Sequence, residues 1–596
     1  MTEHFLLVII LLTALLLFWK QWVRTDITAV IVMMALILPW PHPGGEWKGI
    51  ISYNDGFSGF GSPAVIMVAA MFIFGGAIVK TGAAEVLGLK FFRANAGKEW
   101  RFQLTILFVS ALSSMFINDT TVILIYLPMI LSICKEKKLV PSRYLLFLAY
   151  GSLLGGQWTL IGTRSNIIIS DFFRQSTGEG LGFFDFTPVA ALVFIMAGLY
   201  FMLAGKRFLP EKKKLSGGDQ KGQREYLTEV IITKDSAVSG KSIKEFEWSD
   251  RSNLSVIEIL RDNERMPDWV KLKPNDMLII KGDVDAIGQL LKSSDFQLKE
   301  EVKIDPETLQ SVDLVTVDAL LSPGSRYAGR TLNQVDFSMY YGFTTIGIYR
   351  HGKTIRKKPS DVKLQYGDSL LLLGHVSDIE RLGKNKNLML LEEESFPAIG
   401  KRKAIITVIL LFGIIITSIT NILSPPVSIP LAALLAIILG CIKPEDAYNT
   451  VDWRTVVTVA AMIPFGIALQ QTHSAEAIAM FTVRTLAGGG PIFVMGAAFL
   501  FAVFLTQFID NAAAAIILAP LAFQLSVIMH VDPKPFMVGL AICISSAFAT
   551  PVAHESTILV MGPGNYDFKH YFIIGAGMAF LTWLAAVLFT PLIWPF

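Results

Sequence analysis

The chain has 596 residues, of which 53% are hydrophobic and 17% are charged, and its mean hydropathy is +0.52. Soluble domains usually carry about 25% charged residues, so an ordinary soluble enzyme is excluded. The net charge of +3 gives no basic surface for a nucleic acid. Positions 211–400 alone hold 28 basic and 30 acidic residues, and the flanking sequence is apolar. The composition therefore predicts a membrane protein with a soluble insert.

Apolar stretches long enough to cross about 30 Å of hydrocarbon as helices lie on both sides of the insert. They cover residues 4–19, 26–41, 62–80, 143–169, 188–204, 403–421, 428–442, 454–470, 535–560 and 571–594. The first stretch lacks the basic start and the cleavage site of a secretory signal, so we expect a retained transmembrane helix. Two further apolar segments, 101–133 and 490–529, are broken by polar residues at their centres.

Lysine and arginine clusters set the expected orientation, because short cytoplasmic loops are enriched in them. The clusters are Lys20 and Arg24; Arg93, Lys98 and Arg101; Lys135, Lys137 and Lys138; Lys206 and Arg207; and Lys401, Arg402 and Lys403. This pattern predicts an outside N-terminus and a cytoplasmic insert. It also places both ends of 101–133 in the cytoplasm, which predicts a re-entrant hairpin with its tip at the polar centre.

The two membrane halves match each other when the sequence is shifted by 391 positions. Residues 65–87 and 456–478 share 11 identities in 23 positions, and 116–128 match 508–520 at nearly the same shift. Five predicted crossings separate the first matched spans, so the two copies point in opposite directions. Inverted repeats with interrupted helices are typical of secondary transporters, whose sites form near the midplane between the copies.

Four polar interruptions fall into two pairs related by the repeat. Residues 118–121 and 510–513 occupy the predicted hairpin tips, whereas 162–166 and 550–557 each split a long helix. Irregular backbone is tolerated at membrane depth only where protein or a water-filled cavity satisfies it. Freed carbonyls can ligate a small cation, and half-helix N-termini can hold an oxyanion.

Charged residues inside these interruptions are functional candidates by default. The repeat shift superposes Arg164 on Glu555, so the two side chains could form an ion pair between the halves, or Arg164 could bind a carboxylate or sulfate bidentately. His554 and Glu555 are candidates for carrying protons or for supporting roles. Asp119 and Asp510, at the hairpin tips, indicate cation binding.

At these residues the sequence resembles the divalent-anion/sodium symporter family, and within it the bacterial sulfate-type branch that carries a soluble insert. The resemblance covers both membrane halves and the insert. Its motifs are Asn118-Asp-Thr-Thr with Pro128, Leu160-Ile-Gly-Thr-Arg-Ser-Asn166, Phe184-Asp-Phe-Thr-Pro188, and Thr550-Pro551 followed by Met561-Gly-Pro-Gly564.

The resemblance implies a homodimer in a bacterial inner membrane that moves a small anion with sodium by an elevator-like displacement of the hairpins. The expected cation ligands are Asn118, Asp119, Thr120, Gly162, Asn166, Asp510, Asn511, Ala512, Thr550 and Thr557. The expected substrate ligands are Asn118, Thr120, Thr121, Thr163, Arg164, Ser165, Asn511, Glu555, Ser556 and Thr557.

The sequence departs from the symporter pattern at several of these positions. Asp119 replaces the usual Asn and is more like arsenite-efflux and citrate–metal relatives, Arg164 replaces a small residue or proline, and Ala512 lacks a hydroxyl. His554 and Glu555 replace an uncharged pair. These changes affect the coupling ion and the substrate but not the expected fold.

The insert contains a second duplication. Residues 236–243 resemble 325–332, and 270–280 resemble 362–372. Each copy reads as a βαββ-like α+β module and resembles the TrkA-C regulatory modules of potassium-conductance regulators, which dimerise and bind small ligands or nucleotides. No Gly-rich dinucleotide fingerprint is present, and the basic run that starts at Arg350 is either a phosphate-attracting surface or a solvated hairpin.

The expected fold is a polytopic α-helical membrane protein with an inverted repeat, two re-entrant hairpins, broken helices and an α+β insert. The expected domains are residues 1–208 and 399–596 for the membrane halves and 209–300 and 301–398 for the TrkA-C-like modules. The leading hypothesis is a sodium-coupled symporter of sulfate or a C4-dicarboxylate, surrounded by membrane lipid. A cation/proton antiporter, an arsenite-type efflux carrier and a ligand-gated channel remain alternatives, and no residue pattern calls for an enzyme.

Overall fold

A computed structural model gives the fold of the chain. The structure describes residues 3–20, 22–41, 47–209, 401–420, 422–551 and 553–596 and, within the insert, 226–234, 236–242, 254–261, 264–267, 269–282, 290, 295–298, 314–322, 325–335, 337, 341–350, 361–375, 378, 381–382, 385 and 387–390. Most of the basic run after Arg350 and one residue of the second helix break, Val552, lie outside the described residues.

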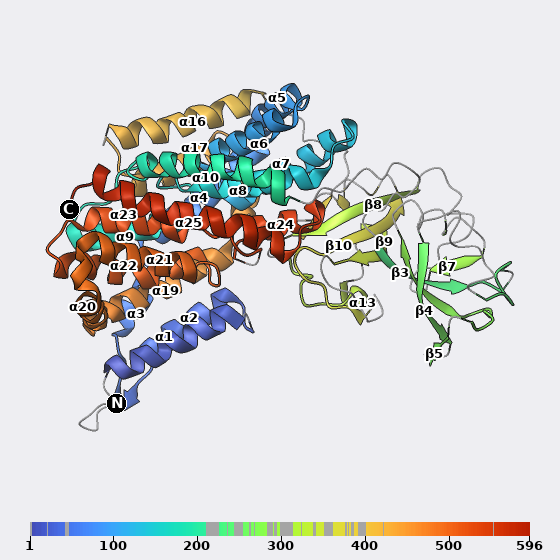
Figure 1. Ribbon diagram of the computed structural model, residues 1–596, viewed down its shortest axis with the longest axis horizontal. Coiled ribbons are helices and arrows are strands. Elements are labelled where there is room, and N and C mark those ends of the chain that lie inside the picture. The colour runs from blue at the N-terminus through green and yellow to red at the C-terminus, as the bar shows by residue number, and fades with distance from the viewer. Residues whose placement is uncertain are drawn as a thin grey trace. The chain divides into compact units, whose positions relative to one another are not determined.

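The chain forms two compact units. One consists of Met1–Leu209, Ser395–Val560 and Phe568–Phe596, and the other of Pro210–Glu394 with Met561–Asp567. The described residues of the first unit form helices apart from one short hairpin, and the second unit contains a large sheet (Figure 1).

The helices form two series, one before and one after the insert in the sequence. The first series is α1 (Glu3–Lys20), α2 (Thr25–Ile37), the hairpin β1 (Trp40–Pro41) and β2 (Trp47–Lys48), α3 (Tyr53–Ser58), α4 (Pro63–Lys80), α5 (Ala83–Asn95), α6 (Glu99–Ser114), α7 (Asp119–Glu136), α8 (Leu145–Gly156), α9 (Arg164–Thr177) and α10 (Thr187–Phe208). The second is α16 (Lys401–Ile419), α17 (Pro425–Ile438), α18 (Pro444–Thr450), α19 (Trp453–Gln471), α20 (Ser474–Leu486), α21 (Gly490–Leu505), α22 (Asn511–Ile528), α23 (Pro533–Ile544), α24 (Glu555–Gly564) and α25 (Phe568–Ile593).

The two series have the same succession of helices and similar backbone details at their ends. Left-handed residues follow the ends of equivalent helices: Gly82 after α4 and His473 after α19, then Lys138 after α7 and His530 after α22. A left-handed residue after the last helical turn is a common way to end a helix. The repeated sequence therefore produces repeated local structure.

Each predicted interruption lies where one helix is followed by the next, but its last residues, such as 119–121 and 164–166, already form the first turn of the second helix. Four residues lie between α6 and α7 and five between α21 and α22, at the two expected tips, and longer irregular segments separate α8 from α9 and α23 from α24. The sequence did not predict α5 and α20, which follow α4 and α19. Both are only moderately apolar, because each contains charged side chains such as Lys90 and Glu476.

Six of the described helical segments are long and apolar enough to cross a membrane. They are Tyr53–Lys80, Thr187–Ala204, Arg402–Ile419, Trp453–Gln471, Asn511–Ile528 and Phe568–Ile593. Four shorter apolar helices, His4–Phe18, Thr25–Ile37, Pro425–Ile438 and Pro533–Ile544, accompany them. This content agrees with a multi-pass membrane protein.

The insert contains one antiparallel sheet made from two similar groups of strands (Figure 1). The first group is β3 (Tyr226–Ile232), β4 (Leu254–Arg261), β5 (Glu264–Met266), β6 (Met277–Gly282) and β7 (Phe296–Leu298). The second is β8 (Leu314–Leu321), β9 (Phe343–Tyr349), β10 (Ser369–His375) and β11 (Leu388–Leu390), with the short helix α13 (Leu332–Val335) between β8 and β9. Leu227 in β3 pairs with Ile348 in β9 and joins the two groups.

An arginine–aspartate pair recurs in both groups of strands. Arg261 donates to both carboxylate oxygens of Asp276 at 2.7 Å, and Arg350 does the same to Asp368 at 2.6 Å. Both aspartates are 1% exposed. Bidentate pairing offsets the desolvation of a buried carboxylate. An arginine–aspartate pair of this kind therefore stabilises both the turn before β6 and the turn before β10.

The two groups of strands share apolar packing. Alternate residues of a strand face opposite sides of a sheet, and in β10 Leu370 and Leu372 pack in the core of the second group. Leu371 and Leu373 instead join the core of the first group. The insert is therefore one folded body rather than two independent modules.

Glycine allows α8 to approach α6 closely. A Cβ atom on Gly155 would collide with the backbone carbonyl of Ala111, and one on Gly151 would collide with Ser110 and Leu107. Small residues at membrane helix contacts let backbones come together. This contact packs α6, which leads into the first tip, against α8, which leads into the first irregular segment.

We predict that Gly155→Ala destabilises the protein by about 1–3 kcal/mol, because the added methyl group overpacks a backbone contact. Gly97→Ala is the matched control, since a Cβ there meets nothing within 4 Å. Thermal unfolding of the purified full-length protein measures both variants. Equal melting temperatures for the two would contradict the close packing of α6 and α8.

Candidate functional site

The two hairpin tips are built in the same way. The Asn118 side chain caps α7 by accepting the Thr120 backbone N–H at 3.0 Å, and the Asp510 side chain caps α22 by accepting that of Ala512 at 2.9 Å. Asn and Asp are favoured at this position because they satisfy a helix N–H that has no partner within the helix. The caps also direct the positive ends of two helix dipoles toward the interior.

The break between α8 and α9 is held by Asn166. Its side-chain amide donates to the Thr159 carbonyl at 2.9 Å and, more weakly, to the Gly156 carbonyl at 3.5 Å. The other side-chain atom, Oδ1, is buried and has no hydrogen-bond partner. The carbonyl of Gly162 lies beside Gly156, as does the Oγ atom of Ser114.

Other oxygens without partners lie near Asn166. The Oγ atom of Ser114, at the end of α6, and the Oε1 atom of Gln157, next to Gly156, are both buried and unpaired. Buried polar groups without partners are rare and call for an explanation. Of these residues, Ser114 and Asn166 both lie beside Gly156.

The break between α23 and α24 is held by the equivalent position. Thr557 donates to the carbonyl of Pro551 at 3.0 Å and to that of His554 at 2.7 Å. The His554 ring caps α24, because its Nδ1 atom accepts the backbone N–H of Ser556 at 3.2 Å. The Ser556 hydroxyl is buried and unpaired.

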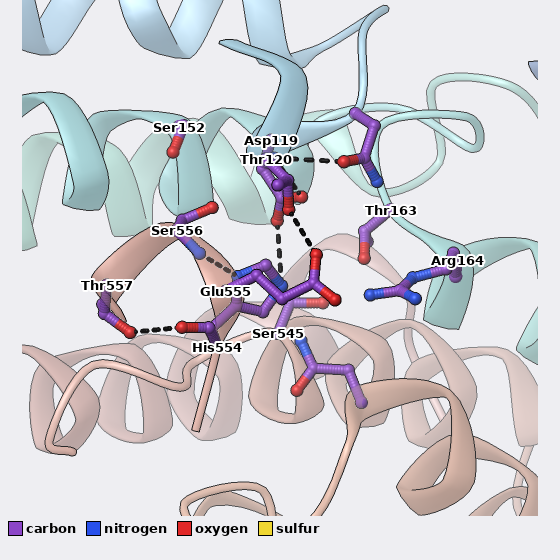
Figure 2. Close-up of polar contacts among 12 residues, drawn as sticks. Asp119, Thr120, Ser152, Thr163, Arg164, Ser545, His554, Glu555, Ser556 and Thr557 are labelled. Atoms are coloured by element: carbon purple, nitrogen blue, oxygen red, sulfur yellow. Dashed lines mark hydrogen bonds and ion pairs between the residues drawn. The ribbon is translucent and has the colours of Figure 1, made fainter. Parts of the chain in front are cut away.

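Two contacts join the first tip to the second broken helix (Figure 2). His554 Nε2 lies 3.2 Å from Asp119 Oδ2, and Thr120 donates its hydroxyl to Glu555 Oε2 at 3.1 Å. Because Nδ1 of His554 is occupied as an acceptor, the ring proton resides on Nε2 and is donated to Asp119. His554 thus positions Asp119 while it caps α24.

Arg164 begins α9 and contacts the second half of the chain. Its Nη1 donates to Thr455 Oγ1 at 2.7 Å, and its Nη2 lies 3.7 Å from Asp510 Oδ2. Thr455 in turn donates to Asp452 at 2.6 Å, and Asp452 caps α19. The buried guanidinium is therefore held from two sides.

The structure distinguishes the alternatives for Arg164 and Glu555. In Figure 2 the two side chains point toward each other, but the ion-pair partner of Arg164 is Asp510 and the hydrogen-bond partner of Glu555 is Thr120. Arg164 begins α9 and pairs with the cap of α22, and Glu555 begins α24 and accepts a hydrogen bond from the first turn of α7, so these helix starts contact each other in pairs. The structural ion pair between Arg164 and Glu555 that the superposition allowed is not formed.

The remaining predicted residues lie around this centre. Ser165 shares a hydrogen bond of 3.0 Å with Ser545, and Thr163 lies within 3.4 Å of Ser165. Asn511 accepts the Thr506 hydroxyl at 2.6 Å, and Thr550 donates to the Gln507 carbonyl at 2.9 Å. Ala512 is buried in the first turn of α22, and Thr121 is half-buried in the first turn of α7.

Several residues at the centre were not predicted from the sequence. Ser114 and Gln157 contribute unpaired oxygens, and Thr455 and Asp452 hold Arg164. The repeat gave one usable signal, since a shift of 392 places Ser114 on Thr506, the residue that contacts Asn511. Asp452 is typical of an ordinary helix cap, so nothing in the sequence distinguished it.

Comparison with known proteins identifies the family. The family model described as "Citrate transporter" (CitMHS) matches residues 13–542. The chain belongs to the citrate transporter family. This membership agrees with the expected kinship to sodium-coupled anion transporters.

Several proteins with similar sequences are named transporters. An uncharacterized transporter of Synechocystis is 27% identical over 98% of this chain and 96% of its own length. An uncharacterized transporter of Escherichia coli, YfbS, is 28% identical over 98% of each chain. Sodium/sulfate cotransporter 2 of Chlamydomonas reinhardtii is 25% identical over 61% of this chain and 42% of its own.

We predict that two substitutions of Asp510 separate its two contacts. Asp510→Ala removes the cap, worth about 1 kcal/mol, and also leaves Arg164 less compensated. Asp510→Asn keeps an oxygen that can accept the Ala512 N–H and loses only the charge. In thermal unfolding of the purified protein, the Asn variant should melt between the wild type and the Ala variant; equal melting of the two variants would rule out the capping role.

Proposed function

We propose that this transporter is a sodium-coupled symporter of a small divalent oxyanion, either sulfate or a C4-dicarboxylate. The observation that carries the proposal is the meeting of four helix N-termini around Arg164, beside buried oxygens that have no partner. An anion and a cation can both be accommodated in such a place. The sodium/sulfate cotransporters among the relatives support this chemistry.

The anion would bind between the N-termini of α9 and α24. Their backbone N–H groups and dipoles favour negative charge, and the planar fork of Arg164 matches two oxyanion oxygens. Hydroxyls of Thr163 and Ser556 are available as donors, whereas the Ser165 hydroxyl donates to Ser545, so Ser165 would contribute its backbone N–H. The buried, unpaired hydroxyl of Ser556 supports this assignment best.

Sodium would bind among neutral oxygens and carboxylates at the tips. In the first half the ligands would be side-chain oxygens of Asn166, Ser114 and Gln157 and the carbonyl of Gly162. In the second half they would come from the Asp510, Asn511, Ala512, Thr550 and Thr557 region. Neutral oxygens bind a hard cation without the full cost of a buried charge.

The charges around Arg164 explain why transport would require a cation. Four carboxylates, Asp119, Asp452, Asp510 and Glu555, interact electrostatically with this one guanidinium. Four carboxylates around one guanidinium would give the site an excess of negative charge, which would repel a divalent anion. Sodium bound first would remove this repulsion, which makes anion binding depend on sodium.

The same proposal extends to the architecture. The two series of helices would be oppositely oriented copies, in which α6–α7 and α21–α22 would form re-entrant hairpins. The protein would be a homodimer in a bacterial inner membrane, and transport would occur by an elevator-like displacement of the hairpins. The insert would be a cytoplasmic pair of TrkA-C-like modules. A nucleotide or other small ligand bound there would regulate transport only if it favoured one conformation.

A cation/proton exchanger or arsenite-type carrier is the second candidate, favoured by the contact of His554 with Asp119. In such a carrier the proton would move at the contact between His554 Nε2 and Asp119 Oδ2, which lie 3.2 Å apart. Proton coupling would then use Asp119, which the resemblance to the symporters places among the cation ligands.

We predict that Arg164→Ala and Asp119→Ala each lower substrate uptake at least about 100-fold while the protein still assembles. Removing one partner of a buried charge network costs about 2–5 kcal/mol, and 2.7 kcal/mol is about 100-fold. Arg484→Ala, at an exposed position on α20, is the matched control and should transport normally.

Uptake is measured in proteoliposomes with sulfate, succinate and citrate under an imposed sodium or proton gradient. Sodium-driven uptake of sulfate or succinate supports the proposal. Uptake driven only by protons would replace it with the second candidate, and normal uptake by both variants would remove the site assignment.

We further predict that Asn166→Ala raises the sodium concentration for half-maximal thermal stabilisation about tenfold, because a lost polar ligand costs about 1–3 kcal/mol. Asn95→Ala, at the end of α5, is the control. Potassium should not stabilise either protein. An unchanged sodium response in Asn166→Ala would disprove the cation assignment at the first break.

A further inference from the structure

A cavity lies where α5 and α6 face α16 (Figure 1). Its volume is about 520 Å³, within the range of about 300–1,000 Å³ for small-molecule pockets. Large apolar side chains line it, and several are half-exposed, including Phe91, Phe108, Leu112 and Phe412.

The side-chain hydroxyls that line the cavity already use their protons in hydrogen bonds within the protein, so none is free to donate to an occupant. Thr105 donates to the Arg101 carbonyl at 2.7 Å, Thr407 donates to the Lys403 carbonyl at 2.9 Å, and Ser113 shares a hydrogen bond of 2.7 Å with Tyr126. All the other residues in its lining are apolar. The part of a ligand that fills this space is therefore expected to be hydrocarbon.

Cationic side chains precede the lining residues on two of the helices that form the cavity, α6 and α16. Exposed Arg101 lies one turn before Thr105 on α6, and exposed Arg402 and Lys403 lie one turn before Thr407 on α16. These are two of the basic clusters that the sequence places on the cytoplasmic side, where the leaflet is rich in anionic lipids. Arg101 lies over the exposed Trp100 ring, 5.4 Å from its centroid, and tryptophan is typical of the headgroup level.

We propose that this cavity binds an anionic phospholipid, with one acyl chain between α6 and α16 and the headgroup phosphate beside Arg101, Arg402 and Lys403. The fully hydrogen-bonded, apolar interior selects the chain, and the cations at the edge select the headgroup. The site is independent of the transported anion, because none of its residues belongs to the site around Arg164. Bound lipid would separate the first hairpin from α16.

Native mass spectrometry of the purified full-length protein tests this site without a transport assay, so its result is independent of the proposed function. Phosphatidylglycerol and phosphatidylcholine are titrated separately, and the lipid-bound fraction is measured. We expect the wild type to retain phosphatidylglycerol several-fold more strongly. The double variant Arg101→Gln/Lys403→Gln should lose this preference and still bind phosphatidylcholine as the wild type does.

A cavity-filling variant, Leu112→Trp, should weaken the binding of both lipids several-fold. Leu199→Trp on α10 and Arg484→Gln on α20, both at exposed positions outside the cavity lining, are the matched controls and should bind like the wild type. Equal retention of the two lipids by the wild type would overturn the headgroup assignment. Unchanged binding in Leu112→Trp would overturn the cavity as the site.

Discussion

The structure depends on satisfying backbone groups at four places where helices stop inside an apolar region. A peptide N–H or C=O left without a partner there costs several kcal/mol, because no water is available in hydrocarbon. Asn118 and Asp510 cap the two tips, His554 caps α24, and Asn166 and Thr557 bond the carbonyls of the two irregular segments. These bonds determine where the helix N-termini point and therefore where charge can be held.

The same side chains both support the backbone and shape the electrostatics. Asp510 caps α22 with one oxygen and faces Arg164 with the other, and His554 caps α24 with one nitrogen and contacts Asp119 with the other. Because each of these side chains both caps a helix and contacts a charged or ionisable group, few substitutions change only the capping or only the electrostatics. Conservative substitutions that keep an acceptor and remove a charge are therefore more informative than truncations to alanine.

Much of this organisation could be predicted from the sequence. The 391-residue shift located both tips and both breaks, because polar residues in a long apolar run are costly and stand out. Arg164 and Asp510 were identified individually, but their pairing was not, since a repeat shift superposes equivalent positions and does not reveal which residues face each other.

The helices α5 and α20 and the unpaired oxygen of Ser114 were missed for another reason. The charged residues of α5 and α20 dilute the hydrophobic signal, and a lone serine near a helix end is common everywhere. In the insert, the strongly apolar run after the turn at Gly367 and Asp368 predicted the strand β10, but its two faces pack in two different cores, and only the structure shows this.

The glycine contact between α6 and α8 has a mechanical consequence. With Gly151 and Gly155 against the α6 backbone, the spacing between the first tip and the first irregular segment is fixed by backbone atoms, which cannot yield as side chains do. Half of the candidate site is thus a stiff block. A conformational change that opens the candidate site to the opposite face of the membrane would have to move α6 and α8 together as a rigid body. The backbone would then bend at the connections to this body, for example at the left-handed residue Gly82 between α4 and α5.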